Sequence, residues 1–292
     1  MPVTSPLTLR DRRRGRIRPQ LDRLRGVLAE LGNPQQAFPS ILVVGTNGKG
    51  STAAMLEAVL REHGMSTGLY TSPHLVRVEE RIRLSGRMVA EAVLDGHLRR
   101  LEPFADLTYF EALTAAAFAV FAEAGVDVVV LEAGMGGSWD ATRLAQSPIA
   151  GLTNVGSDHP DWLGSKRVQI AGDKGQALAA ADDAVLGPGV TGDVVSELGA
   201  PLAIPAASLL DVSSHAGNRA RVTWDGVEFE VVLPLPGAHQ IENLHLALAL
   251  VLLPSVLISA AAERCPQGSW SCCGKGGAAL PPVAGSSERG GS

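Results

Sequence analysis

The chain has 292 residues, of which 46% are hydrophobic and 19% charged, and its formal net charge at pH 7 is −5. This length allows one large or two modest domains, and this composition excludes global disorder. The negative net charge argues against a general nucleic-acid binder, and no apolar run reaches the roughly 18–20 residues that a membrane-spanning helix needs.

Two terminal features bear on location and partners. The stretch from Arg10 to Arg18 is rich in arginine, which indicates either a solvated arm or a contact for an anionic ligand. It leads into no apolar segment, so we expect no secretory signal. The cysteines, Cys265, Cys272 and Cys273, all lie near the C-terminal end, which argues against a disulfide framework and fits a reducing cytoplasm. We therefore expect a cytoplasmic protein without nucleic-acid or membrane partners.

The first elements in chain order form a recognisable unit. Apolar residues at helical spacing predict a helix over 21–31, and the apolar β-branched run 41–44 predicts a buried parallel strand. A glycine-rich turn follows over 45–52, and a second helical pattern runs from Ser51 to Gly64. This order of strand, glycine turn and helix is typical of a phosphate-binding loop.

The alternation of strands and helices continues along the chain. It predicts strands at 67–71, 126–131, 149–153, 184–186 and 202–204, and helices at 89–101, 108–124, 166–181 and 193–198. Such alternation favours an α/β fold with a doubly wound, mainly parallel sheet flanked by helices.

The pattern changes near the C-terminal end. Two strands at 219–224 and 227–233 flank the turn dipeptide Asp225-Gly226, which predicts a β-hairpin, and a final helix is expected over 241–252. After Pro254 the residues are mostly Gly, Ser, Pro and Ala. We therefore predict an ATP-binding domain over 1–253 and a low-complexity, disordered tail over 254–292.

The turn Gly-Thr-Asn-Gly-Lys-Gly-Ser-Thr at 45–52 carries the clearest chemistry. Glycines let backbone N–H groups converge on phosphate oxygens, the helix adds its positive N-terminal end, and Lys49 supplies a cation. The spacing differs from the general G-x-x-x-x-G-K-[ST] form, because Gly50 stands where that form has a hydroxyl residue. The alternative is a plain glycine turn between a strand and a helix.

Two further groups are expected at the same edge of the sheet. Glu132 ends a strong strand pattern, and a carboxylate at the carboxyl end of a strand either holds Mg²⁺ beside the nucleotide or caps the next element. His159 follows the next strand, and it is either a ligand or a structural histidine.

The loop at 45–52 resembles that of the folylpolyglutamate synthases and dihydrofolate synthases, members of the Mur ligase superfamily. Other segments resemble landmarks of this family in the same order, from about Ile17 to Leu250: 31–34, 71–74, 109–111, 131–137, 140–142, 157–159, 163–164 and 234–243. The resemblance implies a Mur ligase central domain and a ligase that uses ATP and Mg²⁺ to phosphorylate a carboxylate, which the amine of L-glutamate then attacks. The implied acceptor is dihydropteroate, a reduced folate, or both, and monomers are usual in the family.

The resemblance also implies roles for individual residues. For ATP these are Asn47, Gly48, Lys49, Gly50, Ser51, Thr52 and Asn243. For magnesium they are Ser72, Glu132 and His159, and for the pteroate group they are Leu21, Asp22, Arg23, Thr108, Tyr109, Phe110, Glu111, Trp139, Asp140 and Ala141. Lys49, His159 and a carbamylated Lys174 are the implied catalytic residues. From the sequence alone, Lys174 is a solvated helix lysine, and Tyr109 and Phe110 are equally well helix core residues.

The chain departs from the family pattern in several places. Ser138-Trp139 replaces the usual Arg-Leu, Arg143 replaces the usual Asn, and Gln20 stands where a glycine is common. The resemblance stops near Leu250, before the C-terminal domain that the family carries. Two alternatives to a folate-pathway ligase therefore stay open: a catalytically impaired ATP-binding remnant, and a Mur-type ligase for a cell-wall precursor.

Overall fold

An eight-stranded sheet forms the centre of the protein, in the order β4-β3-β2-β5-β1-β6-β7-β8. The computed structural model describes residues 20–157, 166–190, 192–198, 203–214, 218–233 and 235–253. Neighbouring strands from β2 to β8 run parallel, while β3 and β4 add an antiparallel edge. The strands are β1 (Ser40–Val44), β2 (Thr67–Tyr70), β3 (Ile82–Leu84), β4 (Arg87–Met88), β5 (Val128–Glu132), β6 (Ile149–Asn154), β7 (Asp183–Gly189) and β8 (Ala203–Pro205).

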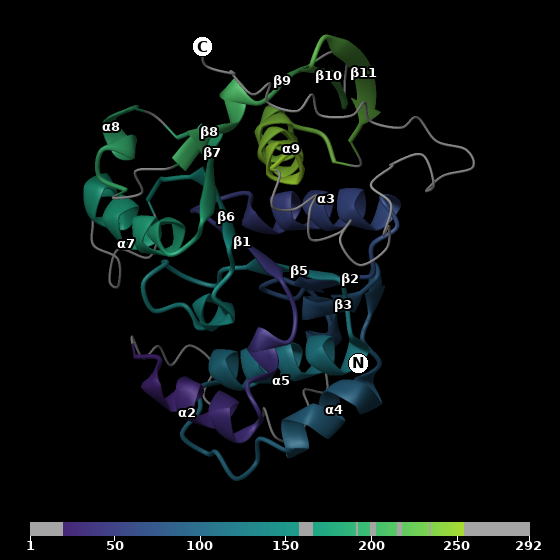
Figure 1. Cartoon of the computed structure of the whole chain (residues 1–292), viewed down its shortest axis with the longest axis vertical. Coiled ribbons are helices and arrows are strands. Elements are labelled where there is room, and N and C mark those ends of the chain that lie inside the picture. Colours follow the sequence, from purple (N-terminus) through teal and green to yellow (C-terminus); the bar gives the residue numbers. More distant parts are fainter. Residues whose placement is uncertain are drawn as a thin grey trace, which may run out of the picture.

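Helices cover both faces of this sheet (Figure 1). One face carries α2 (Asp22–Glu30), α4 (Glu91–Arg99), α5 (Tyr109–Ala124) and α7 (Arg167–Ala179), and the other carries α3 (Lys49–Glu62) and α9 (Ala238–Val251). The short α8 (Gly192–Val195) lies beside α7. Four 3₁₀ turns lie among the described residues: η1 (Pro34–Gln36), η2 (Val78–Arg81), η3 (Ala141–Ala145) and η4 (Ala206–Ser208).

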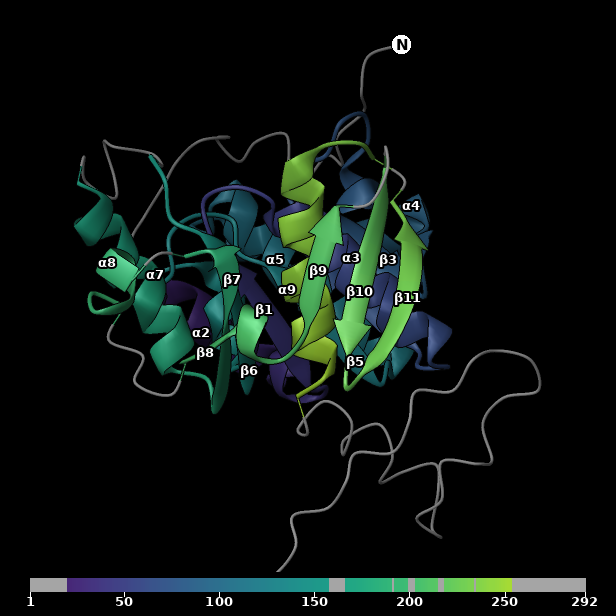
Figure 2. The ribbon, with the colours of Figure 1, turned by 90° about the horizontal axis from the view of Figure 1, so that it is seen from above.

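A second, small sheet lies outside α9. It has the order β11-β10-β9, with β9 (Asp211–Ser214), β10 (Arg219–Trp224) and β11 (Val227–Val232) all antiparallel. Figure 1 shows this sheet on the side of α9 away from the main sheet, and seen from above β9 lies next to α9 while β10 and β11 lie in front of α3 (Figure 2). The C-terminal part of the described chain thus forms an extra layer over the α3 and α9 face.

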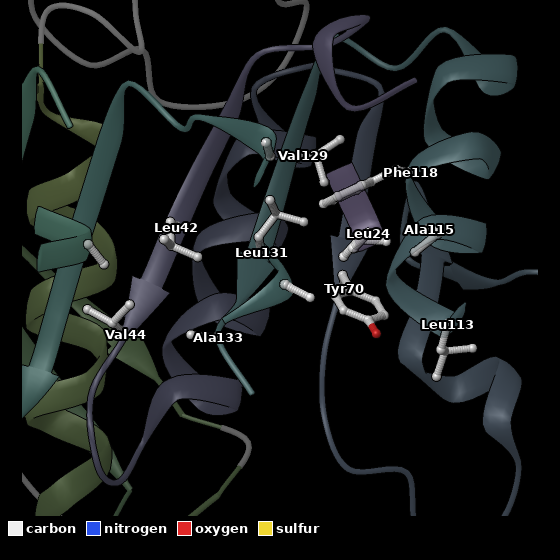
Figure 3. Packing of buried hydrophobic residues seen from close by; sticks show 14 of the residues in the cluster. Leu24, Leu42, Val44, Tyr70, Leu113, Ala115, Phe118, Val129, Leu131 and Ala133 are labelled. Atoms are coloured by element: carbon white, nitrogen blue, oxygen red, sulfur yellow. The ribbon is translucent and has the colours of Figure 1, made fainter. Parts of the chain in front are cut away.

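The central strands explain this layering. Every residue of β1 and β5 is buried, as expected for parallel strands covered on both faces. Because side chains alternate along a strand, Leu42 and Val44 enter the cluster under α5, while Ile41 and Val43 enter the cluster under α3 and α9. Figure 3 shows the first of these clusters, in which side chains of β1, β2 and β5 face those of α2 and α5.

The predicted alternation is confirmed, and so is the mainly parallel sheet. The structure corrects several details: α3 begins at Lys49 rather than Ser51, the expected hairpin is part of a three-stranded sheet, and β3, β4 and β9 were not predicted. These three strands have two to four residues, too few to show a period in the sequence.

Several predictions fall outside the described residues: the arginine-rich stretch, residue 202, the cysteines and the tail over 254–292. Within the described part of the chain, no helix is long and apolar enough to cross a bilayer.

Candidate active site

The glycine-rich loop leaves the carboxyl end of β1 in a conformation that requires glycine at two positions. Gly45 has φ 147° and Gly48 has φ 81°, a region that residues with a Cβ rarely adopt. A Cβ on Gly45 would lie 1.9 Å from Oγ1 of Thr153, and one on Gly48 would lie 2.1 Å from Oδ1 of Asn243. The loop is therefore packed against β6 on one side and α9 on the other, which brings the predicted ATP contact Asn243 to the loop.

The end of β6 holds the loop in place. Oδ1 of Asn154 accepts a bond from the N–H of Asn47 at 3.0 Å, and the carbonyl oxygen of Asn154 accepts one from the N–H of Thr46 at 3.0 Å. The hydroxyl of Thr153 donates to the carbonyl oxygen of Asn47 at 2.6 Å. Sequence analysis missed Thr153 and Asn154, although both end the strand that pairs with β1.

The loop opens directly into the N-terminus of α3. Gly48 is the N-cap, and no side chain caps this helix end. The first N–H groups of a helix have no intrahelical partner and carry partial positive charge, so this end suits an anion. Ser51 is half-buried, whereas Thr52 is fully buried and its N–H donates to the carbonyl oxygen of Gly48 at 2.9 Å.

Two lysine ammonium groups converge on one carbonyl oxygen of the loop. Nζ of Lys49 lies 3.0 Å from the oxygen of Gly45 and 3.1 Å from that of Thr46. Nζ of Lys174, on α7, lies 2.8 Å from the same Gly45 oxygen. Only 1% of Lys174 is exposed, so the interpretation of Lys174 as a solvated helix lysine is wrong. The loop is thus contacted by a buried cation from a helix more than a hundred residues away.

Glu132 meets this loop from the end of β5. Oε2 of Glu132 would lie 3.2 Å from a Cβ on Gly50, and it accepts a bond from the N–H of Ser72 at 2.8 Å. The carboxylate therefore lies between the start of α3 and the segment that follows β2. Its closeness is a physical reason for glycine at position 50, where a larger residue would crowd the carboxylate.

The surroundings of Glu132 suit a divalent cation. Burial raises the pKa of the Glu132 carboxyl, while the bond from Ser72 and the positive charges of Lys49 and Arg81 oppose this rise. A cation would offset the cost of burying the carboxylate. Magnesium prefers oxygen ligands and keeps several waters, so one carboxylate and one hydroxyl beside a phosphate site fit it. The third predicted ligand, His159, lies outside the described residues.

The segments predicted to contact the pteroate group come together around the start of α5. Thr108 and Glu111 form a capping box, in which Oε2 of Glu111 accepts from the N–H of Thr108 at 2.7 Å. Oε1 of Glu111 pairs with Arg23 of α2 at 2.9 Å. The ring of Phe110 covers Gly134, where a Cβ would lie 2.6 Å from Cζ, so α5 is joined to the segment after β5.

Other residues predicted to contact the pteroate group make contacts within their own segments. Asp140 is buried and uses its carboxylate within its own loop, accepting from the N–H of Met135 at 2.8 Å and from the N–H of Thr142 at 2.9 Å. Ala141 is buried beside it, and Trp139 is half-buried against the core. Leu21 is half-buried, whereas Asp22 is exposed and pairs with Arg25 at 2.7 Å.

The sequence did not predict the contact between Arg81 and His74, which lies near the start of α5. Nε of Arg81 donates to Nδ1 of His74 at 2.8 Å, and the guanidinium carbon lies 5.8 Å from the centre of the Tyr109 ring. Only 9% of Arg81 is exposed. An arginine among charged residues (Glu79-Glu80-Arg81) gives no signal of burial in the sequence.

Comparison with known proteins agrees with this geometry. Residues 43–181 match the Mur ligase middle domain family. Over 268 residues, 81% of this chain, it is 37% identical to the dihydrofolate synthase/folylpolyglutamate synthase of Mycobacterium tuberculosis, covering 55% of that protein. Over 262 residues, 82% of this chain, it is 39% identical to a probable bifunctional folylpolyglutamate synthase/dihydropteroate synthase of Haloferax volcanii, covering 31% of that protein.

Solved structures give the same result. The folylpolyglutamate synthase of Mycobacterium tuberculosis complexed with ADP matches with a TM-score of 0.75 and 36% identity, over 83% of this chain and 59% of that one. The E. coli FolC structure in complex with DHPP and ADP matches with a TM-score of 0.73 and 28% identity, over 90% of this chain and 67% of that one. The chain thus spans a third to about half the length of the curated relatives named here. By fold, site and sequence, it belongs to the folylpolyglutamate synthase and dihydrofolate synthase family of Mur ligases.

Proposed function

We propose that this protein is an ATP-dependent ligase that joins L-glutamate to dihydropteroate, a reduced folate, or both, through an acyl phosphate. The observation that carries the proposal is the meeting of the glycine-rich loop with Glu132 at Gly50, where a Cβ would lie 3.2 Å from Oε2. This arrangement puts a phosphate site and a carboxylate suited to Mg²⁺ side by side. The relatives support it, since their solved complexes contain ADP, AMPPNP, Mn and L-glutamate.

The loop residues would bind the nucleotide. Backbone N–H groups from Gly48 to Gly50, at the start of α3, would face the phosphates, and Lys49 would move from the carbonyl oxygens of Gly45 and Thr46 to the outer phosphates. Asn243, packed on Gly48, lies against the loop from α9. Phosphoryl transfer depends mainly on positioning and charge neutralisation, which these groups supply.

Ser72, Glu132 and His159 would hold magnesium, which neutralises charge on the transferring phosphoryl group. Lys174 would act as its carbamate. A carbamylated Nζ keeps one N–H, which can still donate to the carbonyl oxygen of Gly45, and adds an anionic group that can position a second metal. Carbamylation joins the neutral amine to CO2 with release of a proton, and the bound cations would offset the negative charge of the buried carbamate.

The acceptor would bind near the start of α5. Phe110 and Tyr109 offer aromatic surface there, and the pair of Glu111 with Arg23 fixes α2 against it. Asp140 and Ala141 shape the neighbouring loop. A monomer in the cytoplasm stays a prediction.

Purified protein tests the proposal directly. We expect ATP binding by calorimetry, and release of ADP only when L-glutamate and dihydropteroate or tetrahydrofolate are both present. A matched reaction with UDP-linked muramyl substrates is the control. ADP release with the muramyl substrates alone, or no release with any acceptor, would overturn the proposal; binding of ATP without turnover would mean a nucleotide-binding remnant.

A further inference from the structure

Arg81 is a buried arginine that contacts both the segment after β2, which carries Ser72, and the start of α5, which carries Tyr109. It ends η2, and its carbonyl oxygen accepts a bond from the N–H of Thr71 at 2.9 Å, directly after β2. Only 9% of the residue is exposed. Its backbone is therefore fixed to the segment that carries Ser72.

The side chain of Arg81 contacts two rings. Its Nε donates to Nδ1 of His74 at 2.8 Å, and its guanidinium carbon lies 5.8 Å from the centre of the Tyr109 ring. Because Nε of an arginine can only donate, Nδ1 of His74 is the acceptor in this bond. The positive charge of Arg81 also reaches Glu132, where it favours the ionised carboxylate.

The charge of Arg81 has no carboxylate partner among the described residues. None of the ion pairs in the described part of the chain includes it, although the exposed Arg77 on the same turn pairs with both Glu79 and Glu91. Buried charges in proteins are normally paired, because an unpaired one loses its hydration without compensation. A buried guanidinium that forms no ion pair among the described residues is therefore suited to an anionic ligand.

We infer that Arg81 binds the carboxylate of the acceptor substrate and directs it toward the phosphate site. This rests on the proposed function. The guanidinium carbon lies 5.8 Å from the centre of the Tyr109 ring, at the start of α5. The backbone of Arg81 is bonded to Thr71, and the next residue, Ser72, donates to Glu132 beside the glycine-rich loop. A carboxylate bound at Arg81 would therefore lie between the acceptor-binding segment and the phosphate site. A guanidinium matches a carboxylate with two parallel hydrogen bonds, which a lysine does not. For dihydropteroate, the group recognised is thus the free aromatic carboxylate rather than its neutral amide.

The competing explanation is structural: Arg81 only supports the segment from Thr71 to Arg77 through His74. The two explanations predict that different properties change when Arg81 is replaced. A structural role affects the melting temperature and all ligands alike, whereas a carboxylate-binding role affects the acid and spares its amide.

Calorimetry with dihydropteroate and with its carboxamide, both in the presence of ADP, separates these roles. For Arg81→Gln we expect the affinity for the acid to fall about 10–100-fold, as for a lost charge-assisted hydrogen bond, and the affinity for the amide to change less than about twofold. Arg81→Lys should lie between the wild type and Arg81→Gln. Arg77→Gln, which removes the same charge from the exposed side of the same turn, is the matched control and should leave both affinities unchanged.

Two results would overturn the inference but leave the proposed function intact. One is an affinity for the acid that is the same in the wild type and in Arg81→Gln, and the other is an equal loss of affinity for the acid and for the amide. A wild-type protein that binds ADP and neither dihydropteroate nor a folate would overturn the proposed function, and the inference with it. Melting temperature and ADP affinity check that the variants are folded. If Arg81→Gln does not fold, Arg81→Lys decides, and an unchanged ratio of acid to amide affinity in it overturns the inference.

Discussion

The N–H of Ser72 donates to Oε2 of Glu132 at 2.8 Å, which joins the ends of β2 and β5 at the edge where the glycine-rich loop leaves β1. Ligands of open α/β sheets bind at such an edge, where the chain continues to opposite sides of a strand. In this sheet the chain passes from β1 to β2 on one side of β1, and it later passes from β5 to β6, which lies on the other side of β1. The predicted magnesium pair is therefore placed by the topology of the sheet.

Replacing Lys49 by alanine should weaken ATP binding by about 10–100-fold, because a charge-assisted contact to the phosphates is lost. The fold should survive, since the hydrogen bonds of Lys49 Nζ within the described part of the chain go to carbonyl oxygens of its own loop. Calorimetry with ATP measures the effect. Arg99→Ala, which removes one positive charge from the exposed end of α4, is the control; equal affinities in both variants would contradict a phosphate role for Lys49.

Replacing Gly50 by alanine should reduce the gain in ATP affinity that Mg²⁺ provides. The new Cβ would lie 3.2 Å from Oε2 and 3.4 Å from Oε1 of Glu132, so the carboxylate must move, at a cost of about 1–3 kcal/mol. ATP titrations with and without Mg²⁺ test this. Gly96→Ala is the matched control, because no atom lies within 4 Å of its Cβ in α4. That control should instead stabilise the protein by roughly 0.5–1 kcal/mol.

Replacing Glu132 by glutamine should raise the melting temperature in metal-free buffer at pH 7 and abolish stabilisation by Mg²⁺ with ADP. Burial raises the folded pKa of Glu132 above its ordinary value of 4.5, so the folded state keeps a proton that the unfolded chain has lost. This group therefore lowers stability as pH rises from about 4.5 through the folded pKa. Glutamine removes the penalty and can still accept from Ser72.

The expected difference is on the order of 1 kcal/mol, or about 2–4 °C for a domain of this size. Thermal melts of both proteins across pH 4 to 8 measure it, and the difference should vanish at the acidic end. A variant that melts below the wild type at pH 7 without metal would show that the carboxylate is not penalised by burial.

Replacing Lys174 by alanine should lower ADP release roughly 100-fold or more while ATP still binds, as expected when a group that acts on the transferring phosphoryl is lost. Lys174→Met, which keeps the length of the buried side chain without Nζ, separates loss of chemistry from loss of packing. Near-normal turnover in the methionine variant would exclude a catalytic carbamate.

Replacing Thr108 by alanine should cost about 1 kcal/mol, because Oγ1 of Thr108 caps α5 by accepting from the N–H of Glu111 at 3.2 Å. The start of α5 carries Tyr109 and Phe110, so acceptor binding should fall along with stability, whereas ATP binding should not. Thermal melts and titrations with dihydropteroate and ATP would check this. An equal loss for both ligands would mean that the cap supports the whole fold instead.

The parts of the fold that the sequence predicts are those with local patterns. β1, the loop and α3 follow one another within 25 residues, and each has a clear signal in apolar spacing or glycine content. The position of Glu132 was also predictable, because it ends an uninterrupted apolar strand. The order of the strands and the edge strands β3 and β4 were not, because pairing between distant segments leaves no local pattern.

The missed features all depend on long-range contacts. Lys174 stands in the polar run Gly172-Asp173-Lys174-Gly175, which reads as exposed, yet Gly137 and Gly175 allow backbone segments to approach α7 and bury it. Its partner Gly45 is 129 residues away. Arg81 was missed because it stands among charged residues, and its burial depends on contacts with His74, seven residues earlier, and with Tyr109 of α5.

The shared oxygen of Gly45 has a thermodynamic consequence. Two ammonium groups that face one acceptor repel each other, so an anion that draws Lys49 away would relieve this repulsion, and converting Lys174 into its carbamate would remove the like charge that Lys49 faces. Such coupling is reciprocal. If bound nucleotide changes the equilibrium constant for carbamylation of Lys174 by some factor, carbamylation changes the affinity for the nucleotide by the same factor. The filling of the loop and the chemical state of a lysine on α7 are therefore linked through a single backbone carbonyl.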